Sequence, residues 1–463
     1  MAALYTLDEL LAATGGTTRG DPGPVSAISI DSRDIEPGAL FVAIRGENFD
    51  GHDFVAAAFA KGAAAALVSA DKAEGLDGPL IVAPDALQGL VALARHARAR
   101  SGARIAAITG SVGKTTTKEA LRAILATAGA THASPKSFNN HWGVPLTLAR
   151  MPADSGFGVF EIGMNHPGEI TALVALVRPH VSLITAIAPA HLEQLGSLAA
   201  IARAKAEIFA GLESGGTAIV NVDHEHADLL VSEARRQDVG RVVTYGYAET
   251  ADWRIVNYRV DDTGAQAVLT DGQSHHPIRI AAPGRHMIAN AAGAVLAAIE
   301  LGLDWPATLE GLVGFGAQQG RGARITLGVP GRELILIDES YNANTASMRA
   351  ALDVFASVTA PGGRKVVILG DMLELGEATS ALHAGLAPAV RASGADRVIL
   401  VGPAMTALAD ALAGWGAVRH FPDANALSSV LGDTLAYGDA VMVKGSNGVR
   451  LTQLIEEIRR IFG

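Results

Sequence analysis

Residues 105–118, which read IAAITGSVGKTTTK, constrain the fold of this chain more than any other stretch. The apolar run from Ile105 to Ile108 predicts a buried parallel strand, and a glycine-rich turn follows it. Apolar residues at helical spacing over 116–128 then predict a helix. A strand, a glycine turn and a helix N-terminus in this order form an anion site, because the backbone N–H groups of the turn have no helical partner.

The turn also carries the residue types of a phosphate-binding loop. Its two glycines let the backbone approach phosphate oxygens, the lysine supplies positive charge, and the threonine hydroxyl can ligate Mg²⁺. Ile108 stands where the general pattern has its first glycine, so the motif is a shorter variant. A tight strand–helix turn with an incidental Gly-Lys-Thr is the alternative, but the order of strand, turn and helix favours a phosphate site. The residues expected at the nucleotide are Gly110, Ser111, Val112, Gly113, Lys114, Thr115 and Thr116.

Composition excludes several classes of protein. A chain of 463 residues is too long for one core, so two or three domains are expected. A net charge of −10 argues against a nucleic-acid-binding surface, and the absence of cysteine excludes disulfides and thiolate metal sites. No apolar run is long enough to span a membrane, and the acidic first eleven residues do not resemble a signal peptide. We therefore expect a cytoplasmic protein of the α/β class.

The first unit, residues 1–100, is expected to be a small α/β domain. Apolar runs predict strands over 27–30, 39–44 and 65–68, and a helix over 54–61. Two polar clusters follow these strands, one around Ser32 and Arg33 and one around Asp50 and His52. Loops after strand ends hold ligands in α/β folds. Ordinary turn chemistry is the alternative, because Asp, Asn and Gly are turn formers.

The second unit, residues 101–320, begins at the phosphate loop. Strands are expected up to Glu161 and over 181–185, 217–222 and 241–245, and a helix over 199–209 carries Lys205. Residues 253–282 are rich in β-formers, and an Ala-rich helix is expected over 291–301. Glu161 and His191 end or follow separate parallel strands, which places them at the edge of the phosphate loop. Glu161 is a natural Mg²⁺ ligand. His191 is a less usual one, and a single histidine in a loop is more often a hydrogen-bonded structural residue.

The third unit, residues 321–463, alternates strands and helices and predicts a Rossmann-like sheet. Its strands are expected over 334–337, 365–369, 397–401 and 440–443, with helices over 346–356 and 451–461. Polar loops follow two of these strands, one from Asp338 to Asn344 and one from Lys444 to Gly448. The second loop is either a further small anion site or an ordinary strand-to-helix turn.

Together these motifs resemble the Mur ligase family of ATP-dependent amide ligases over the whole chain. The shortened phosphate loop, the strand ending in Glu161 and Asn139-Asn140-x-x-Gly-Val-Pro-Leu match the family. So do Ala190-His191-Leu-Glu and Ala204-Lys205-Ala-Glu-Ile-Phe. Asp31-Ser-Arg, Asp50-Gly-His-Asp-Phe, Asp338-Glu-Ser-Tyr-Asn-Ala-Asn and Gly370-Asp-Met-Leu-Glu-Leu-Gly favour members that add D-Ala-D-Ala. Thr345, where proline is usual, is a departure that could loosen its turn.

The resemblance implies three domains: a UDP-sugar substrate domain, a central P-loop ATPase-like domain and a C-terminal Rossmann-like domain. It implies a monomeric, ADP-forming ligase that joins D-Ala-D-Ala to UDP-N-acetylmuramoyl-tripeptide through an acyl phosphate, in peptidoglycan synthesis. Two alternatives stay open. One is a neighbouring family member that adds a single amino acid, and the other is a P-loop NTPase that is not a ligase.

The resemblance also implies roles for single residues. Lys114 would hold the ATP phosphates, Thr115 and Glu161 one Mg²⁺, and His191 and Lys205 a second. An ammonium beside Mg²⁺ is repulsive, so Lys205 is expected to be carbamylated; outside this resemblance, a helical lysine is normally a solvated charge. Asn290, supported by His286, would contact adenine, and Arg324 and Asp338 would reach the nucleotide from the third domain. Candidates for the peptidyl substrate and the incoming dipeptide are Ser32, Arg33, Asp50, His52, Asn139, Tyr341, Asn342 and Asn344.

Overall fold

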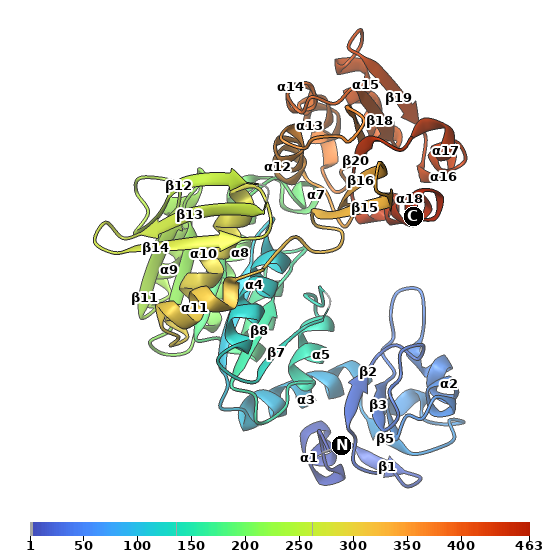
Figure 1. Cartoon of the computed structure of the whole chain (residues 1–463). Helices are drawn as coiled ribbons and strands as arrows, with labels where there is room; N and C mark the ends of the chain where they lie inside the picture. The colour runs from blue at the N-terminus through green and yellow to red at the C-terminus, as the bar shows by residue number, and fades with distance from the viewer. Residues whose placement is uncertain (1–2, 136, 262) are drawn as a thin grey trace.

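The computed structural model describes residues 3–135, 137–261 and 263–463. Three β-sheets follow one another along the chain, and each carries its own helices (Figure 1). The predicted α/β class and three-domain architecture are therefore confirmed. The predicted boundaries near residues 100 and 320 fall just before the first strand of the second sheet and of the third sheet.

The N-terminal sheet has five strands in the order β1-β5-β4-β3-β2, parallel except for β1. Its strands are β1 (Thr17–Arg19), β2 (Ala27–Ser29), β3 (Ala39–Val42), β4 (Ala65–Ser69) and β5 (Leu80–Ala83). Its helices are α1 (Leu7–Thr14), α2 (Val55–Ala60) and α3 (Ala86–Arg100). The strands β1 and β5 and the helices α1 and α3 were not predicted. The sequence nevertheless marks α1, because Thr6 and Glu9 form a capping box at its start.

The middle sheet has nine strands in the order β14-β13-β12-β11-β10-β9-β6-β8-β7. The seven strands from β6 to β12 are parallel to one another, and β13 is antiparallel to both of its neighbours, β12 and β14. The parallel strands are β6 (Arg104–Thr109), β7 (Thr131–Ala133), β8 (Phe157–Glu161), β9 (Val181–Ile184), β10 (Thr217–Asn221), β11 (Arg241–Gly246) and β12 (Trp253–Asp261). The other two are β13 (Gly264–Thr270) and β14 (His275–Ile280).

The helices of the middle domain place its polar loops. They are α4 (Lys114–Ala126), α5 (Gly143–Ala149), α6 (Glu169–Val177), α7 (Leu192–Leu195), α8 (Leu198–Ala206), α9 (Ala227–Arg236), α10 (Arg285–Glu300) and α11 (Trp305–Leu312). The helix predicted from residue 291 begins at Arg285, so His286 and Asn290 lie one turn apart in the same helix. Because β6 lies between β8 and β9, the loop after β6 shares its sheet edge with Glu161 and Thr185.

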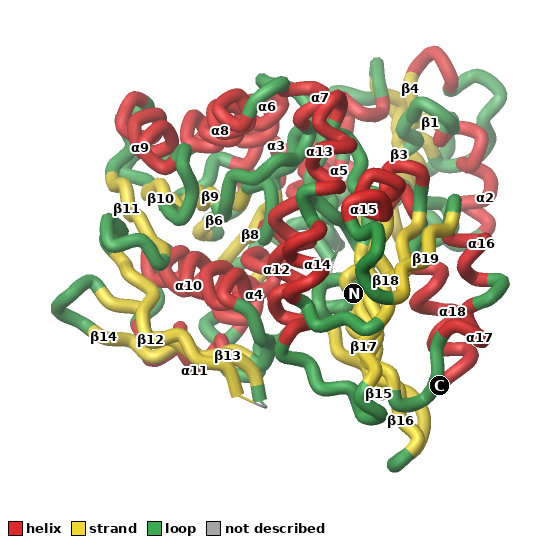
Figure 2. The backbone as a smooth tube through the Cα atoms, turned by 90° about the horizontal axis from the view of Figure 1, so that it is seen from above, coloured by secondary structure: helices red, strands yellow, loops and turns green. Residues whose placement is uncertain are grey.

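The C-terminal sheet has six strands in the order β15-β16-β20-β17-β18-β19, with β15 antiparallel to β16. The strands are β15 (Ala323–Val329), β16 (Arg332–Glu339), β17 (Arg364–Gly370), β18 (Arg397–Val401), β19 (Ala417–Phe421) and β20 (Asp439–Lys444). The helices are α12 (Thr345–Ala356), α13 (Thr379–Ala384), α14 (Ala387–Ala392), α15 (Thr406–Ala411), α16 (Ala424–Ser428), α17 (Leu431–Thr434) and α18 (Thr452–Phe462). Figure 2 shows α12 to α15 on one face of this sheet and α16 to α18 on the other.

The short helix α7 brings the middle and C-terminal domains together (Figure 1). The backbone N–H of Glu193 in α7 donates to the carbonyl of Glu374, which lies in the loop after β17. In the part of the chain that the structure describes, no helix is both long and apolar enough to cross a membrane.

Candidate active site

Two residues from neighbouring elements, Asn290 and Thr185, pack closely against the glycines of the phosphate loop. Gly113 has φ +85°, and a Cβ there would lie 2.3 Å from the amide oxygen of Asn290 in α10. Gly110 likewise has no space for a side chain, because a Cβ on it would collide with the hydroxyl of Thr185. That hydroxyl donates to the carbonyl of Val112 at 2.5 Å. Sequence analysis had not assigned a role to Thr185, although its place at the end of β9, beside β6, is the signal that could have found it.

The loop presents donors that suit phosphate oxygens. The ammonium of Lys114 donates to the Gly110 carbonyl at 2.6 Å and is half-buried. Burial lowers the pKa of Lys114, the charge of Glu161 opposes this shift, and the charge of Arg321 adds to it. The buried hydroxyl of Ser111 has no hydrogen-bond partner within the described residues. With the free N–H groups at the start of α4, these groups form an anion site.

Glu161 is held as an oxygen ligand at the start of α4. Its carboxylate is 2% exposed and accepts hydrogen bonds from the Thr115 hydroxyl and the Asn139 amide, both at 2.7 Å. A hydroxyl and a carboxylate are ligands that Mg²⁺ prefers, so the donor set fits this ion. Asn139, predicted at the substrate, therefore also orients Glu161.

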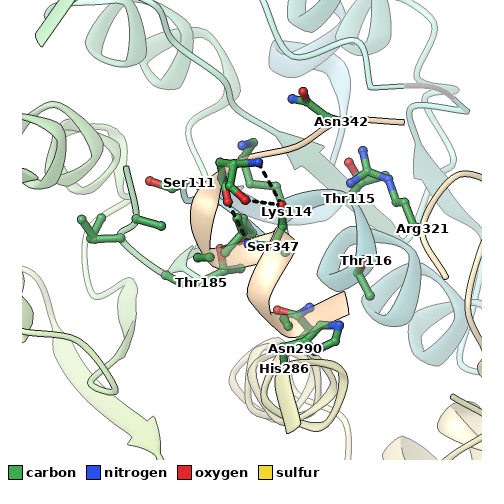
Figure 3. A pocket seen from close by; sticks show the side chains of 18 of the residues that line it. Ser111, Lys114, Thr115, Thr116, Thr185, His286, Asn290, Arg321, Asn342 and Ser347 are labelled. Atoms are coloured by element: carbon green, nitrogen blue, oxygen red, sulfur yellow. Dashed lines mark hydrogen bonds between the residues drawn. The ribbon is translucent and has the colours of Figure 1, made fainter. Parts of the chain in front are cut away.

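Figure 3 shows the cavity above this loop, which has a volume of about 910 Å³ and is lined by both the middle and the C-terminal domain. Glu161, His191 and Lys205 line it together with Lys114. The predicted catalytic residues are thus brought to one place, although their roles stay predictions. Among the described residues no three His, Cys, Asp or Glu side chains gather to hold a metal.

Lys205 is a buried base without a partner. Its side chain is 1% exposed, and no hydrogen bond or ion pair to it occurs within the described part of the chain. Burial lowers the pKa of Lys205 far below its usual range, and the charge of Lys114 lowers it further. A neutral amine is therefore favoured at this position, and a neutral amine is nucleophilic.

His191, in the middle domain, contacts a carboxylate of the C-terminal domain. Its Nδ1 lies 2.6 Å from a carboxylate oxygen of Glu374, and both residues have left-handed backbone, with φ of 57° and 62°. A carboxylate on one ring nitrogen directs the other nitrogen of a histidine toward a ligand. His191 therefore has a contact that ties the cavity to the position of the C-terminal domain.

The C-terminal domain supplies one wall of the cavity, which includes Tyr341, Asn342 and Asn344 as predicted. Asn344 caps α12, where its side chain accepts from the N–H of Ser347 in a capping box, so Thr345 does not leave this turn loose. The ammonium of Lys444 donates to Glu339 and to the Asn342 carbonyl, both at 3.1 Å. The lysine of the loop considered as a second anion site is thus already paired, and it belongs to the main cavity.

Two predicted nucleotide contacts are not brought to the cavity. Arg324 is exposed in β15, and Asp338 is 1% exposed with its carboxylate accepting from the Gly320 N–H at 3.0 Å. Neither residue lines the cavity, but Arg321 does. The nucleotide roles of Arg324 and Asp338 stay predictions, and Arg321, in the loop before β15, is the arginine of this segment that lines the cavity.

The residues predicted for the UDP-sugar end lie in the N-terminal domain, outside this cavity. His52 is 5% exposed and both its ring nitrogens are engaged, one 2.6 Å from Asp50 and one accepting from the Ser69 N–H at 3.0 Å. These contacts support the structural alternative for His52. Arg33 is exposed and paired with Asp31, and Ser32 is half-buried beside it.

Sequence analysis missed a further group of cavity residues around His286. The guanidinium of Arg285 lies 3.8 Å over the ring of Tyr247, whose hydroxyl donates to the Arg285 carbonyl. No motif marks these residues, since they come from the end of β10, the loops after β10 and β11, and the start of α10. The group that lines the cavity comprises Asn221, Asp223, His224, Tyr247 and Arg285.

Comparison with known proteins gives matches along the whole chain. Three family models match: "Mur ligase family, catalytic domain" over 24–100, "Mur ligase middle domain" over 108–298 and "Mur ligase, glutamate ligase domain" over 325–447. A UDP-N-acetylmuramoyl-tripeptide–D-alanyl-D-alanine ligase of Escherichia coli is 36% identical, covering 98% of both chains.

Solved structures give the same result. A crystal structure of MurF from Acinetobacter baumannii has a TM-score of 0.84 at 29% identity, covering 98% of this chain and 99% of its own. MurF ligase from Thermotoga maritima in complex with ADP has a TM-score of 0.77, covering 94% and 97%; at 22% identity this likeness shows the fold.

Proposed function

Because this chain belongs to the Mur ligase family, we propose that it is an ATP-dependent, ADP-forming ligase that joins D-Ala-D-Ala to UDP-N-acetylmuramoyl-tripeptide in peptidoglycan synthesis. Relatives of that name match nearly the full length of the chain. The observation that carries the proposal is the single cavity that joins the phosphate loop, Glu161, His191 and Lys205 to a wall of the C-terminal domain.

The proposed reaction has two steps. A carboxylate oxygen of the tripeptide attacks the γ-phosphorus of ATP, the bond to the bridging oxygen breaks, and ADP leaves with that electron pair. The amine of D-Ala-D-Ala then attacks the acyl carbon of the acyl phosphate, passes through a tetrahedral intermediate, loses a proton and expels inorganic phosphate. Carboxylate and phosphate are both anions, so positioning and cations supply most of the catalysis.

The residues of the loop meet these needs. Lys114 exchanges its carbonyl contact for the β- and γ-phosphate oxygens, and the unpartnered Ser111 hydroxyl donates to the phosphates. Asn290, which packs against Gly113, would contact the adenine of the nucleotide. Thr115 and Glu161 would hold Mg²⁺, which neutralises charge on the transferring phosphoryl group when it is bound.

The second metal site depends on Lys205, because an amine is a poor Mg²⁺ ligand. Its neutral amine can attack CO₂, forming an N–C bond and releasing a proton, to give an anionic carbamate with two oxygens. The complete burial of Lys205 and its lack of a partner within the described residues support this modification. With His191 nearby, the carbamate would hold a second Mg²⁺.

The two substrates would approach from different domains. We place the UDP-sugar end at the N-terminal domain near Ser32, Arg33 and Asp50, with His52 as a support for Asp50. The peptide end and D-Ala-D-Ala would lie at the C-terminal wall with Tyr341 and Asn342. The residues assigned to both substrates all belong to one copy of the chain, so the active form is proposed to be a monomer.

An assay of ADP release tests the proposed function. Protein, ATP, Mg²⁺, UDP-N-acetylmuramoyl-tripeptide and D-Ala-D-Ala are mixed, and each component is left out in turn. We expect ADP only when both peptide substrates are present. ADP formed equally without D-Ala-D-Ala would instead identify a simple NTPase.

The same assay separates a neighbouring ligase. Free D-Ala and diaminopimelate replace D-Ala-D-Ala as the acceptor, and the products are identified by mass. Product from a single amino acid at a rate equal to or above that from D-Ala-D-Ala would contradict the proposed specificity.

A further inference from the structure

We propose that His383 is a positioning residue, which holds the loop after β17 so that Glu374 reaches His191 in the cavity. This loop, residues 371–375, belongs to the stretch Gly370-Asp-Met-Leu-Glu-Leu-Gly, to which the proposed function assigns no role. The inference rests on the proposed function, because it concerns the placement of His191 in that active site. His383 does not line the cavity, so it acts through the loop.

The imidazole of His383 joins α13 to this loop. The side chain is completely buried, with 0% exposure. Its Nε2 accepts a hydrogen bond from the backbone N–H of Met372 at 2.9 Å, and its Nδ1 lies 2.7 Å from the carbonyl oxygen of Thr379. A backbone N–H can only donate and a carbonyl can only accept, so the ring proton is on Nδ1. Each ring nitrogen is therefore committed to one backbone group.

Three consecutive N–H groups of the loop are each held by a different element of the C-terminal domain. The N–H of Asp371 donates to a carbonyl at the end of β18 at 3.1 Å, and the N–H of Met372 donates to His383. The N–H of Leu373 donates to the buried hydroxyl of Ser446, which follows β20, at 3.0 Å. The path of the loop is thus fixed from three sides up to Leu373.

The next residue makes the contact with the middle domain. Glu374 has left-handed backbone, with φ of 62°, which costs energy in a residue with a side chain and persists only where surrounding contacts maintain it. Its carbonyl accepts the N–H of Glu193 at 3.3 Å, and its carboxylate lies 2.6 Å from the Nδ1 of His191. Only one residue separates Glu374 from Met372, so the bond to His383 supports the backbone from which this contact is made.

Loss of the His383 ring would act on the cavity through this short path. Met372 is 1% exposed, so its N–H would be left buried without an acceptor, and the loop would have to move to pair it. Movement of the loop displaces the carboxylate of Glu374. That carboxylate directs the second ring nitrogen of His191, so the side chain of His191 would lose its orientation.

Amide hydrogen exchange of the full chain without substrates, followed at single residues by NMR, tests the proposal. The N–H of Glu193 reports the contact between the domains, and the N–H of Gly196, which donates to the Leu192 carbonyl at 2.8 Å, reports α7 itself. In His383→Ala the exchange at Glu193 should become at least about fivefold faster, while that at Gly196 should stay within about twofold.

Two conservative variants separate the roles of the two ring nitrogens. His383→Gln keeps an acceptor at the reach of Nε2, because its amide oxygen can take the N–H of Met372. His383→Asn keeps only a shorter polar group near the position of Nδ1. Exchange at Glu193 should stay near the wild-type rate in His383→Gln and rise in His383→Asn as it does in His383→Ala. His383→Asn serves as the test if His383→Ala does not fold.

The matched control is His180→Ala. The Nδ1 of His180 also accepts a backbone N–H, that of Ile105 at 3.0 Å, but His180 lies in the middle domain and does not line the cavity. This variant loses the same kind of hydrogen bond, so it should leave exchange at Glu193 within about twofold of the wild type. Urea denaturation gives the stability of each variant for comparison.

Turnover gives a second readout. His383→Ala should lower kcat by about tenfold or more and leave the KM for ATP within about twofold, because His191 is displaced while the phosphate loop is untouched. A change in KM alone would contradict the role assigned to His383.

Three exchange results would overturn the proposal. Unchanged exchange at Glu193 in His383→Ala would show that the loop is held without this ring. Equal acceleration at Glu193 and Gly196, or an equal effect of His180→Ala, would show a general loss of stability. Exchange in His383→Gln as fast as in His383→Ala would exclude the bond to Met372 as the cause. Exchange needs no turnover, so failure of the ADP-release assay would refute the proposed function and leave the exchange result standing.

Discussion

Single residues at the phosphate loop carry two kinds of constraint, one of backbone and one of space. Gly113 adopts φ +85° and also lies against Asn290 with no room for a Cβ. Gly168, at the start of α6, has a similar φ of +88°, but a Cβ added there would meet nothing within 4 Å among the described residues. Comparing substitutions at Gly113 and Gly168 therefore separates two effects on stability. One is the strain of a left-handed backbone, and the other is the close approach of Gly113 to Asn290 in α10.

Gly113→Ala should be more damaging than Gly168→Ala. The strained backbone alone should lower the free energy of unfolding of Gly168→Ala by about 1 kcal/mol. Gly113→Ala should lose about 2–3 kcal/mol, because the clash with Asn290 is added to strain, and it should also lose ATP affinity. Urea denaturation and nucleotide titration measure both effects. Equal stability of the two variants would show that the Asn290 contact does not matter.

Lys205→Ala should reduce turnover by at least about a hundredfold while ATP binding is largely kept, because one oxygen ligand of the proposed second metal site is lost. Short carboxylic acids should restore part of the rate, since they replace the carbamate oxygens. ¹³C NMR after addition of labelled bicarbonate should give a carbamate signal in the wild type and none in Lys205→Ala. A variant with near-normal activity would refute the metal role.

Two short elements, α7 and the loop after β17, form a contact between the middle and C-terminal domains beside the cavity. The contact consists of the 2.6 Å approach of His191 to Glu374 and of the backbone hydrogen bond from Glu193. The side chain of Glu374 is half-exposed in this contact. We predict that this contact orients His191 and that it opens when substrates enter and products leave.

Glu374→Gln should loosen this contact, because the neutral amide of Gln lacks the negative charge that strengthens the interaction with the Nδ1 of His191. The chain contains no cysteine, so Glu249→Cys and Asp410→Cys, both exposed, accept a pair of fluorophores in the two domains. Energy transfer should show a broader spread of interdomain distances in Glu374→Gln and no change in the exposed control Glu377→Gln. Identical distributions for Glu374→Gln and the wild type would contradict the role given to this contact.

At the scale of the whole molecule, the residues assigned to binding are divided among the three domains. The phosphate loop belongs to the middle sheet, one wall of the cavity belongs to the C-terminal domain, and the residues assigned to the UDP-sugar end lie in the N-terminal domain. Separate domains can hold separate ligands without disturbing one another, and their closure brings the reacting groups together.

Lys114→Ala tests this division. It should weaken ATP binding by about tenfold or more, because the charge at the phosphates is removed, and leave the affinity for UDP-N-acetylmuramoyl-tripeptide within about twofold. Titration calorimetry with each ligand alone gives both values. Loss of the UDP-substrate affinity in this variant would show that the two sites are not independent.

The sequence by itself determined those features whose parts are contiguous. The strand, turn and helix of residues 105–126 are adjacent in the chain, so their pattern alone predicted the anion site and its lysine. Alternation of strands and helices also predicted three α/β units. Glu161 and His191 were placed at one edge because parallel strands end together, and Lys205 was assigned to the site only by the family resemblance. The structure brings all three residues to one cavity.

Only the tertiary structure decided which side chains of distant segments meet. Arg321 lines the cavity and Arg324 does not, and Asp338 accepts hydrogen bonds from the two glycines beside Arg321. Thr185 closes the loop because β9 pairs with β6, and His52 is committed to Asp50 and Ser69 within its own domain. Sequence periodicity does not predict such contacts, because packing sets how two distant segments align. A shift of a few residues in that alignment changes which side chain reaches the site.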